Sequence, residues 1–483
     1  MVHQASLPEQ SAPPPRRVER VRHPGRRRAR VEPWARILFL SPPLVMLLFL
    51  VTLVVPLDVT VAGVQLNPNT CLLLVFTAPA FLYWLQHQPR VIGLDVFMLL
   101  YIFWVAVAIY HTHGMSRIVY IINQSVTMLG SYMLGRVLVR NADDYRRMFT
   151  ILFWILLFLL PFALVELVLK INVLGKIFGL PMSSGSGPGG IRLGLRRVTS
   201  VFPHPILFGV FCSIMVSNFF YVFHDHTGTR LRRTLLAFTM TFVSLSTGPN
   251  LAQLGQLILM SWERLFRFFV TKWYVLVVTA VTVLSIGQLS YPGGLYALLV
   301  EHLSFSEHTG WGRLEILAYG TQTVLQHPLY GIGLTGWDGP WWRPPSVDNF
   351  WMVTAMRYGI PALAFIWAGL AWHAVRIIGR SGLTERATNC RRGYVFAAAG
   401  IIFALFAVHM WAAVAVFIMF YFGAGAWLYV GDAALAPVGP RERPRRQPLV
   451  AGPAAAPAAP APQSGRSGRA ASRRTSARQD LHR

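Results

Sequence analysis

Long apolar runs recur along most of this 483-residue chain. The clearest run, residues 148–169, reads MFTILFWILLFLLPFALVELVL and provides the ~20 residues that a helix needs to cross a hydrocarbon core. Inside lipid every backbone amide needs a partner within the protein, so repeated spans fold either as a helix bundle or as a closed barrel. Barrel strands alternate every second residue, whereas these runs are continuous. The sequence therefore predicts an all-α, polytopic transmembrane helix bundle.

The charge of the chain is concentrated at its two ends. Only 13% of residues are charged, yet the net charge is +25. Nine arginines lie in the first 36 residues and ten in residues 432–483, out of 44 lysines and arginines in all. Both ends are poor in apolar residues and cannot bury a core. We interpret residues 1–36 and 431–483 as disordered basic tails that contact anionic lipid and fix topology, with no nucleic-acid partner.

Between the tails, residues 37–430 form the predicted transmembrane domain, with about twelve spans and both termini on the cytoplasmic side. Basic residues then fall in every cytoplasmic turn, as the positive-inside rule requires. The predicted spans are 37–56, 69–85, 92–110, 117–139, 148–169, 205–223, 232–247, 250–267, 273–290, 350–378, 394–410 and 412–430.

Two loops on the outer side depart from this charge rule. Loop 170–204 carries Arg196 and Arg197, so it faces either an anionic ligand or anionic lipid headgroups. Loop 291–349 contains a predicted helix that begins near Gly312 and ends before Pro328. The helix has an apolar face suited to lying on the membrane or the bundle, formed by Leu314, Leu317, Ala318, Thr321, Val324 and Leu325.

The same long loop brings a cation and a carboxylate to one membrane surface. Arg313 lies at the start of the predicted helix, and Asp348 and Asn349 directly precede the span that begins at Phe350. A guanidinium is a planar, permanently charged partner for phosphate oxygens. A carboxylate at this position can either accept a proton as a general base or cap the following helix.

These segments resemble a known family. The stretches WGRLEILAYGTQTVLQHPLYGIGLTGW and SVDNFWMVTAMRYGIPALAF resemble the signature of the O-antigen ligase/polymerase family. Upstream, RRVTSVFPHPILFG and SLSTGPNLAQLGQLIL are similar to two further segments of that family, and the resemblance covers roughly residues 190–375. Many members carry His where this chain has Asp348, and relatives often carry an acidic residue where it has Arg357.

The resemblance implies an inverting glycosyltransferase of the bacterial inner membrane that needs no metal or other cofactor. Its donor would be a glycan linked to undecaprenyl pyrophosphate, and its site would face the periplasm. The acceptor hydroxyl would belong to lipid A–core in the ligase branch, or to another lipid-linked repeat unit in the polymerase branch. Either reaction serves lipopolysaccharide or exopolysaccharide biosynthesis in the cell envelope.

The same comparison suggests roles for individual residues. Asp348 and Arg313 are the predicted catalytic residues. The predicted substrate-binding residues are Arg196, Arg197, Asn349, Arg357 and His204. An ionisable residue inside a span is a functional candidate, although Arg357 could instead reach the interface or pair with Glu166. His204 could equally be an interfacial histidine. A group of tryptophans could form an interfacial belt or stack on sugars, namely Trp311, Trp337, Trp341 and Trp342.

Two other classes of function remain open at this point. A transporter or exporter of an envelope polysaccharide or lipid would also need many spans. Transporters tend to show paired halves with charges near the membrane midplane. This sequence shows no repeat between its halves, and its polar residues gather at the outer surface. A non-enzymatic scaffold for envelope assembly is the third reading, because Asp348 replaces the usual histidine.

Overall fold

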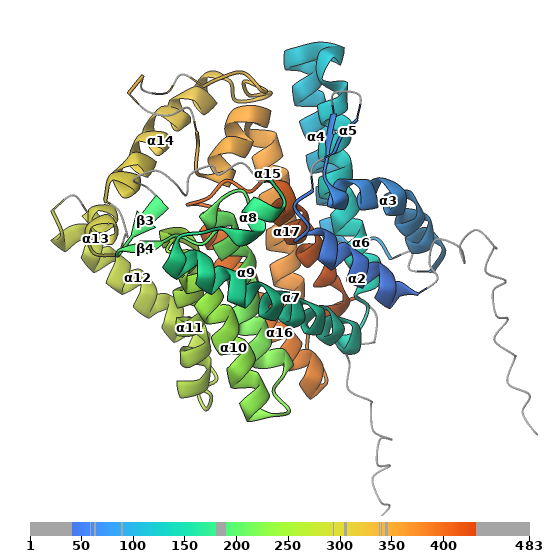
Figure 1. Ribbon diagram of the computed structural model, residues 1–483. Coiled ribbons are helices and arrows are strands. Elements are labelled where there is room, and N and C mark those ends of the chain that lie inside the picture. The colour runs from blue at the N-terminus through green and yellow to red at the C-terminus, as the bar shows by residue number, and fades with distance from the viewer. Residues whose placement is uncertain are drawn as a thin grey trace, which may run out of the picture. The chain divides into compact units, whose positions relative to one another are not determined.

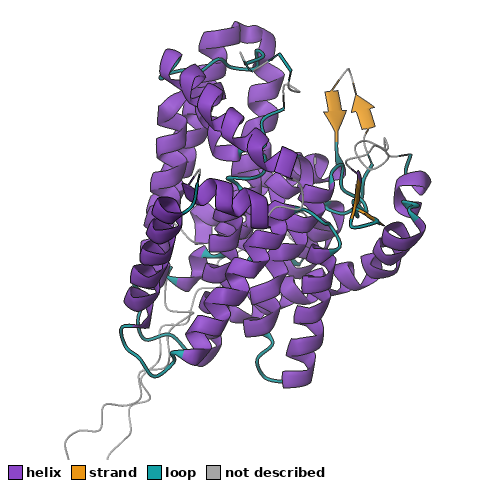
Figure 2. Ribbon diagram, turned by 90° about the vertical axis from the view of Figure 1, so that its left-hand side faces the viewer, coloured by secondary structure: helices purple, strands orange, loops and turns teal. Residues whose placement is uncertain are grey.

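The computed structural model describes residues 41–430, apart from 58, 62–63, 88–89, 180–189, 293, 304–306, 338, 340 and 343–345. The predicted tails at 1–36 and 431–483 lie outside the described residues. The described chain is mostly helical, and its only strands form two short hairpins (Figures 1 and 2). The all-α prediction is therefore confirmed.

The α-helices follow one another along the chain with few long connections. They are α2 (Pro42–Thr52), α3 (Pro68–His87), α4 (Gly93–His113), α5 (Ile118–Ser125), α6 (Ser131–Leu138), α7 (Ala142–Leu169), α8 (Val173–Ile177), α9 (Pro205–Val222), α10 (Thr227–Phe242), α11 (Thr247–Leu265), α12 (Lys272–Ser290), α13 (Gly294–Leu303), α14 (Glu307–Gln326), α15 (Phe350–Ile378), α16 (Glu385–Ala404) and α17 (Ala412–Ala424).

Short elements complete the described chain. The 3₁₀ turns are η1 (Gly114–Arg117) and η4 (Ala426–Leu428), and a π-helical segment, η2 (Val126–Gly130), joins α5 to α6. The antiparallel hairpins pair β1 (Val59–Val61) with β2 (Val64–Leu66), and β3 (Ile191–Arg192) with β4 (Leu195–Arg196).

Six helical stretches of the described residues are long and apolar enough to cross a membrane. They are Pro68–Gln86, Gly93–Leu138, Ala142–Leu169, Pro205–Val222, Lys272–Ser290 and Phe350–Ile378. The helices α2 and α17 are apolar but shorter. These stretches indicate a bilayer environment. The predicted total of about twelve spans is not confirmed, because helices such as α16 begin with charged residues, among them Glu385 and Arg386.

Helix α12 shows why a bilayer suits this surface. None of its residues is buried, and Val277, Val281 and Leu284 are 59%, 58% and 47% exposed. Exposing so much apolar surface of one helix to water is unfavourable, whereas lipid tails are as apolar as these side chains. The exposed apolar side of the bundle therefore agrees with membrane insertion.

Helix α9 forms the centre of the bundle and is buried along nearly its whole length. It contacts α7, α10, α11, α16 and α17. Its 18 residues span about 27 Å at 1.5 Å per residue, close to the ~30 Å of a hydrocarbon core. The polar segments at its two ends are thus about a membrane thickness apart.

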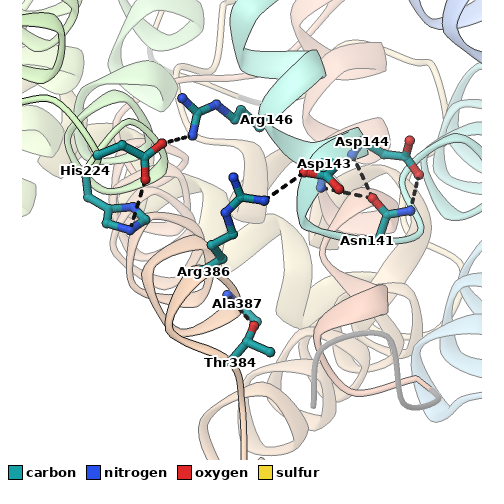
Figure 3. A network of polar contacts seen from close by, with 9 residues as sticks. Asn141, Asp143, Asp144, Arg146, His224, Thr384, Arg386 and Ala387 are labelled. Atoms are coloured by element: carbon teal, nitrogen blue, oxygen red, sulfur yellow. Dashed lines mark hydrogen bonds and ion pairs between the residues drawn. The ribbon is translucent and has the colours of Figure 1, made fainter. Parts of the chain in front are cut away.

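A polar network joins the helix ends near the C-terminus of α9 (Figure 3). Arg146 of α7 pairs with Asp225, which follows α9, and Arg386 of α16 donates to Asp143 at 3.2 Å. The Asn141 side chain caps α7 by accepting from two backbone amides, and Thr384 caps α16. These contacts lie at the bundle end where the sequence places most of its basic loops.

The structure orients helix α14 and corrects the end of one predicted span. Helix α14 stops before Pro328 as predicted, and the side facing the bundle carries Ile316, Gly320 and Thr323. Leu317 and Leu325 of the predicted apolar face are 49% and 70% exposed, so this face is not packed on the bundle. The predicted span 394–410 is wrong at its end, because α16 stops at Ala404 and residues 405–411 form an irregular segment.

Candidate functional site

The β3–β4 hairpin separates two neighbouring arginines. Leu193 and Gly194 turn the chain at φ values of 52° and 76°, and Arg192 pairs with Leu195 across the hairpin. Successive side chains of a strand point to opposite faces. Arg196 and Arg197 therefore leave the hairpin in opposite directions.

Arg196 is held by helix α7. Its Nε lies 3.6 Å from Glu166 Oε1, and its Nη1 donates to the Lys170 carbonyl at 2.8 Å. Glu166 also accepts from the backbone amides of Thr199 and Ser200 at 3.1 and 2.8 Å. Glu166 thus anchors the segment after the hairpin, and it is not the partner of Arg357 that the sequence suggested.

Arg197 and Arg192 instead turn towards the connection between α10 and α11. The Arg197 Nη2 donates to Ser246 Oγ at 2.7 Å, and the Arg192 Nη1 donates to the Leu245 carbonyl at 2.8 Å. Leu245 has a φ of 44°, which presents its carbonyl to the hairpin. Residues 243–246 thus connect α10 to α11 and accept hydrogen bonds from both arginines.

Arg313 and Asp348 belong to the same electrostatic cluster. Burial chiefly lowers the pKa of Arg197, to about 10; Arg192 and Arg313 lower it further, and Asp348 opposes them. Burial and Arg313 likewise lower the pKa of Arg192. Arg313 donates from Nη2 to the Ala407 carbonyl at 3.3 Å. In the part of the chain that the structure describes, these three arginines and Asp348 therefore interact electrostatically with one another. We call Arg192, Arg197, Arg313 and Asp348 the charge cluster.

His204 lies beside the charge cluster at the start of α9. Its Nδ1 accepts a hydrogen bond from the Ile206 amide at 3.1 Å, so the side chain is the N-cap of the central helix. Burial, followed by the charges of Arg197 and Arg192, lowers the pKa of His204 to about 4. The ring is therefore neutral near pH 7 and cannot itself pair with an anion.

The structure decides which residue caps helix α15. Asn349 Oδ1 accepts a hydrogen bond from the Met352 amide at 3.0 Å, so Asn349 is the N-cap. This bond satisfies one of the amides that a helix start leaves without an intrahelical partner. The reading of Asp348 as the cap is therefore wrong, and its carboxylate faces the charge cluster instead.

Helix α15 is broken two residues after Arg357. Gly359 has a φ of 82°, and the amides of Ile332 and Gly333 donate to the carbonyls of Met356 and Arg357 at 2.7 and 3.0 Å. Irregular backbone is tolerated at membrane depth where other parts of the protein satisfy it. The glycine-rich turn after α14 is thus the hydrogen-bonding partner of the break, and the two fix the position of Arg357.

Two cavities meet at Arg357. The outer cavity, of about 380 Å³, is lined by Ile332, Leu334, Thr335, Gly336, Trp337, Ser346, Val347, Asp348, Val353, Met356, Arg357, His409 and Trp411. The inner cavity, of about 330 Å³, lies between α3, α4, α5, α15 and α17. Both are lined by Val353, Arg357, His409 and Trp411. Asp348 and Arg357, nine residues apart in the sequence, therefore face one space.

Sequence reasoning missed two residues of this site. Arg192 was visible in the arginine-rich loop, but only the hairpin register shows that it joins Arg197. His409 was hidden inside a predicted span, and burial followed by the charge of Arg357 lowers its pKa to about 4. Of the four tryptophans singled out, Trp337 lines the outer cavity, whereas Trp341 is 91% exposed.

The arrangement can bind an anion with several negative charges and can present a carboxylate beside it. Comparison with known proteins adds no family to this picture. The chain matches no protein-family model, and it matches no curated protein.

Proposed function

We propose that the protein is a glycosyltransferase that joins a glycan linked to undecaprenyl pyrophosphate to an acceptor hydroxyl. The observation that carries the proposal is the charge cluster, in which Arg192, Arg197, Arg313 and Asp348 interact electrostatically, with Asp348 lining a cavity of about 380 Å³. A pyrophosphate carries several negative charges, and arginine forks match its oxygens. The sequence resemblance to the O-antigen ligase/polymerase family supports the same reaction.

The proposed reaction is an inverting displacement. The acceptor oxygen attacks the anomeric carbon from the face opposite the pyrophosphate and forms the new glycosidic bond. The bond between the anomeric carbon and the pyrophosphate oxygen breaks, and its electron pair leaves with that oxygen. Arg192, Arg197 and Arg313 stabilise the charge that develops there. The proton of the acceptor hydroxyl passes to the Asp348 carboxylate.

Other predicted residues act on substrate position in this scheme. Arg357 lies where the two cavities meet and is suited to bind the pyrophosphate from the inner side. Asn349 holds the start of α15 and thereby fixes the backbone of Asp348. Arg196 and His204 hold the hairpin and the start of α9 beside the cluster.

We further propose that the site faces the periplasm of a bacterial inner membrane. About twelve helices would cross that membrane, with both termini cytoplasmic, and the polar network of Figure 3 would lie at the cytoplasmic surface. Lipid-linked donors suit this location because nucleotide sugars are absent from the periplasm. Between the two branches of the family, Asp348 in place of histidine favours a polysaccharide polymerase over a lipid A–core ligase.

The proposal is tested by comparing glycans from the parent strain with those from a strain that lacks this protein. We expect undecaprenyl-linked intermediates to accumulate while the polymer, or the glycan attached to lipid A, disappears. Single capped repeats would identify a polymerase, and unattached long chains a ligase. An unchanged profile in a strain that makes such glycans and has no second enzyme of this kind would contradict the proposal and favour the transporter or scaffold.

A further inference from the structure

The inner cavity is a polar chamber among otherwise apolar helices. Four side-chain amides line it, contributed by the chain around the start of α3 and by α5, namely Asn67, Asn69, Asn123 and Gln124. Six hydroxyl groups line it as well, from Thr70, Tyr101, Tyr120, Thr127, Thr354 and Tyr358. Polar groups are expensive at membrane depth and are retained there mainly for a function. The lining therefore indicates a ligand rather than lipid.

Several of these polar groups are not used by the fold. The side-chain amides of Asn67, Asn123 and Gln124 make no hydrogen bond to any residue in the described part of the chain. The hydroxyls of Tyr120 and Tyr358, by contrast, bond to each other at 2.5 Å. Asn123 is exposed, and Asn67 and Gln124 are partly exposed. These amides are therefore open to the chamber and available to a ligand with hydroxyl groups.

One wall of the chamber is set by an irregularity in the helix. Asn123 and Gln124 lie three and four residues after Tyr120, and four and three residues before Thr127, so the four share one face. The π-helical segment η2 begins at Val126, inside this polar stripe. Such segments are rare and often mark functional sites. The irregularity thus coincides with the polar wall of the chamber.

The charge of the lining limits the class of ligand. No carboxylate lines the chamber among the described residues, so nothing there would bind a cationic sugar. Arg357, the permanent cation among the described lining residues, lies where the chamber joins the outer cavity. His409 lies at the same junction and is neutral near pH 7, because burial and Arg357 lower its pKa to about 4. The interior offers amides, hydroxyls and aromatic faces, which suit an uncharged polyhydroxyl ring.

We propose that the inner cavity is the subsite for an uncharged sugar ring of the pyrophosphate-linked donor. This inference rests on the proposed function. Asp348 lines the outer cavity, so the acceptor hydroxyl enters there, and the donor ring takes the inner space on the other side of Arg357. A volume of about 330 Å³ falls at the lower end of the range for small-molecule pockets, about 300–1,000 Å³. The chamber therefore suits a small ring system.

The test compares two lipids on the purified full-length protein in nanodiscs. One is farnesyl diphosphate, and the other is the same lipid carrying glucose or N-acetylglucosamine on its diphosphate. Of the two sugar-bearing lipids, we expect the tighter-binding one to have a Kd at least about tenfold lower than that of farnesyl diphosphate. A few net hydrogen bonds to the sugar provide this difference. The double variant Asn123→Ala, Gln124→Ala should lose this gain and keep the wild-type Kd for farnesyl diphosphate, which also shows that it is folded.

Controls separate this inference from the proposed function. Gln86→Ala removes an exposed amide of α3 outside the chamber and should leave both Kd values unchanged. Equal Kd values for the bare and the sugar-bearing lipids would overturn the subsite while leaving the proposed function intact. A larger gain in affinity for a lipid that carries glucuronic acid would show that the subsite does not select an uncharged sugar. If neither lipid binds, the proposed function fails and the subsite with it.

Discussion

Arg196 and Arg197 are neighbours in the sequence, yet the structure gives them different partners. Arg196 pairs with the buried Glu166, whereas Arg197 bonds to Ser246 and shares the field of Asp348. Removing one partner of a buried ion pair is costly, because the other charge stays buried. The two arginines should therefore respond differently to the same substitution.

We expect Arg197→Gln to weaken the binding of farnesyl diphosphate about 10- to 100-fold, the range of one or two charge-assisted hydrogen bonds. Arg196→Gln should leave that Kd nearly unchanged and lower the free energy of unfolding by about 3 kcal/mol. Binding and urea unfolding of the two purified variants check this pair. Equal losses of affinity in both would contradict the assignment.

Asp348 is predicted to act on the reaction and not on donor binding. Asp348→Asn should lower the rate of glycan transfer roughly 10²–10⁴-fold, the usual contribution of a general base, with little change in donor Kd. Asp225→Asn, at the other end of α9, is the matched control and should keep full activity. Transfer at the wild-type rate by Asp348→Asn would remove this residue from the mechanism.

His204 makes stability depend on pH. Its pKa is about 4 in the folded protein, against about 6.5 in the unfolded chain. Between these values the unfolded chain binds the proton, so stability is complete above pH 6.5 and falls as pH drops through 4. The loss should reach up to about 3 kcal/mol.

The variant His204→Asn isolates this effect, because Asn also caps helices well. Urea unfolding between pH 7 and pH 4 should show a shallower loss of stability in His204→Asn than in the wild type. His226→Asn, at an exposed position, is the control and should follow the wild type. A wild-type pH profile in His204→Asn would contradict the assigned pKa.

At the scale of elements, the break in α15 and the turn after α14 form one unit. A Cβ on Gly359 would lie 1.9 Å from the Leu329 carbonyl oxygen, and the φ of 82° disfavours any other residue. We expect Gly359→Ala to lower the free energy of unfolding by about 1–3 kcal/mol. It should also reduce transfer, because it displaces Arg357.

Gly255→Ala in α11 provides the matched comparison, since a Cβ there meets no atom within 4 Å. Unfolding and transfer assays on both variants test the coupling between the turn and the helix. If Gly359→Ala keeps wild-type stability and activity, the break does not position Arg357.

The sequence largely predicted which helices form, but it did not predict which helix faces pack or where each helix ends. The apolar run that begins at Phe350 locates α15 correctly, and Pro328 marks the end of α14. The sequence left open whether the apolar face of α14 lies on the membrane or on the bundle, and the helix packs on the bundle through Gly320 and Thr323, which carry little apolar signal. The end of α16 was missed because residues 405–411 are apolar and still leave the helix.

For the site, too, some residues were predictable from the sequence and others depended on local geometry. The motifs led to Arg197, Arg313, Asp348 and Arg357, because arginine and carboxylate on an outer loop carry a clear chemical signal. Arg192 and the amides of the inner cavity were missed. Their roles depend on hairpin register and on how α3, α5 and α15 pack, neither of which a linear pattern records.

At the scale of the whole molecule, a periplasmic site requires the charge cluster and the polar network of Figure 3 to lie on opposite sides of the membrane. Leu193, in the β3–β4 turn, is 74% exposed, and Gly228 lies at the start of α10 with no atom near its missing Cβ. In a background lacking Cys71, Cys212 and Cys390, Leu193→Cys and Gly228→Cys should react with an impermeant maleimide from opposite sides. Labelling of both from one side would contradict this topology.

The central claim is tested most directly by turnover in a defined system. The purified protein in nanodiscs is given a prenyl-diphosphate-linked oligosaccharide and an acceptor glycan, and both products are quantified. We expect one free prenyl diphosphate for each glycosidic bond formed, inversion at the anomeric carbon, and loss of both products in Asp348→Asn. Donor that stays intact with wild-type protein, although it binds and the acceptor is one that the cell uses, would contradict the claim.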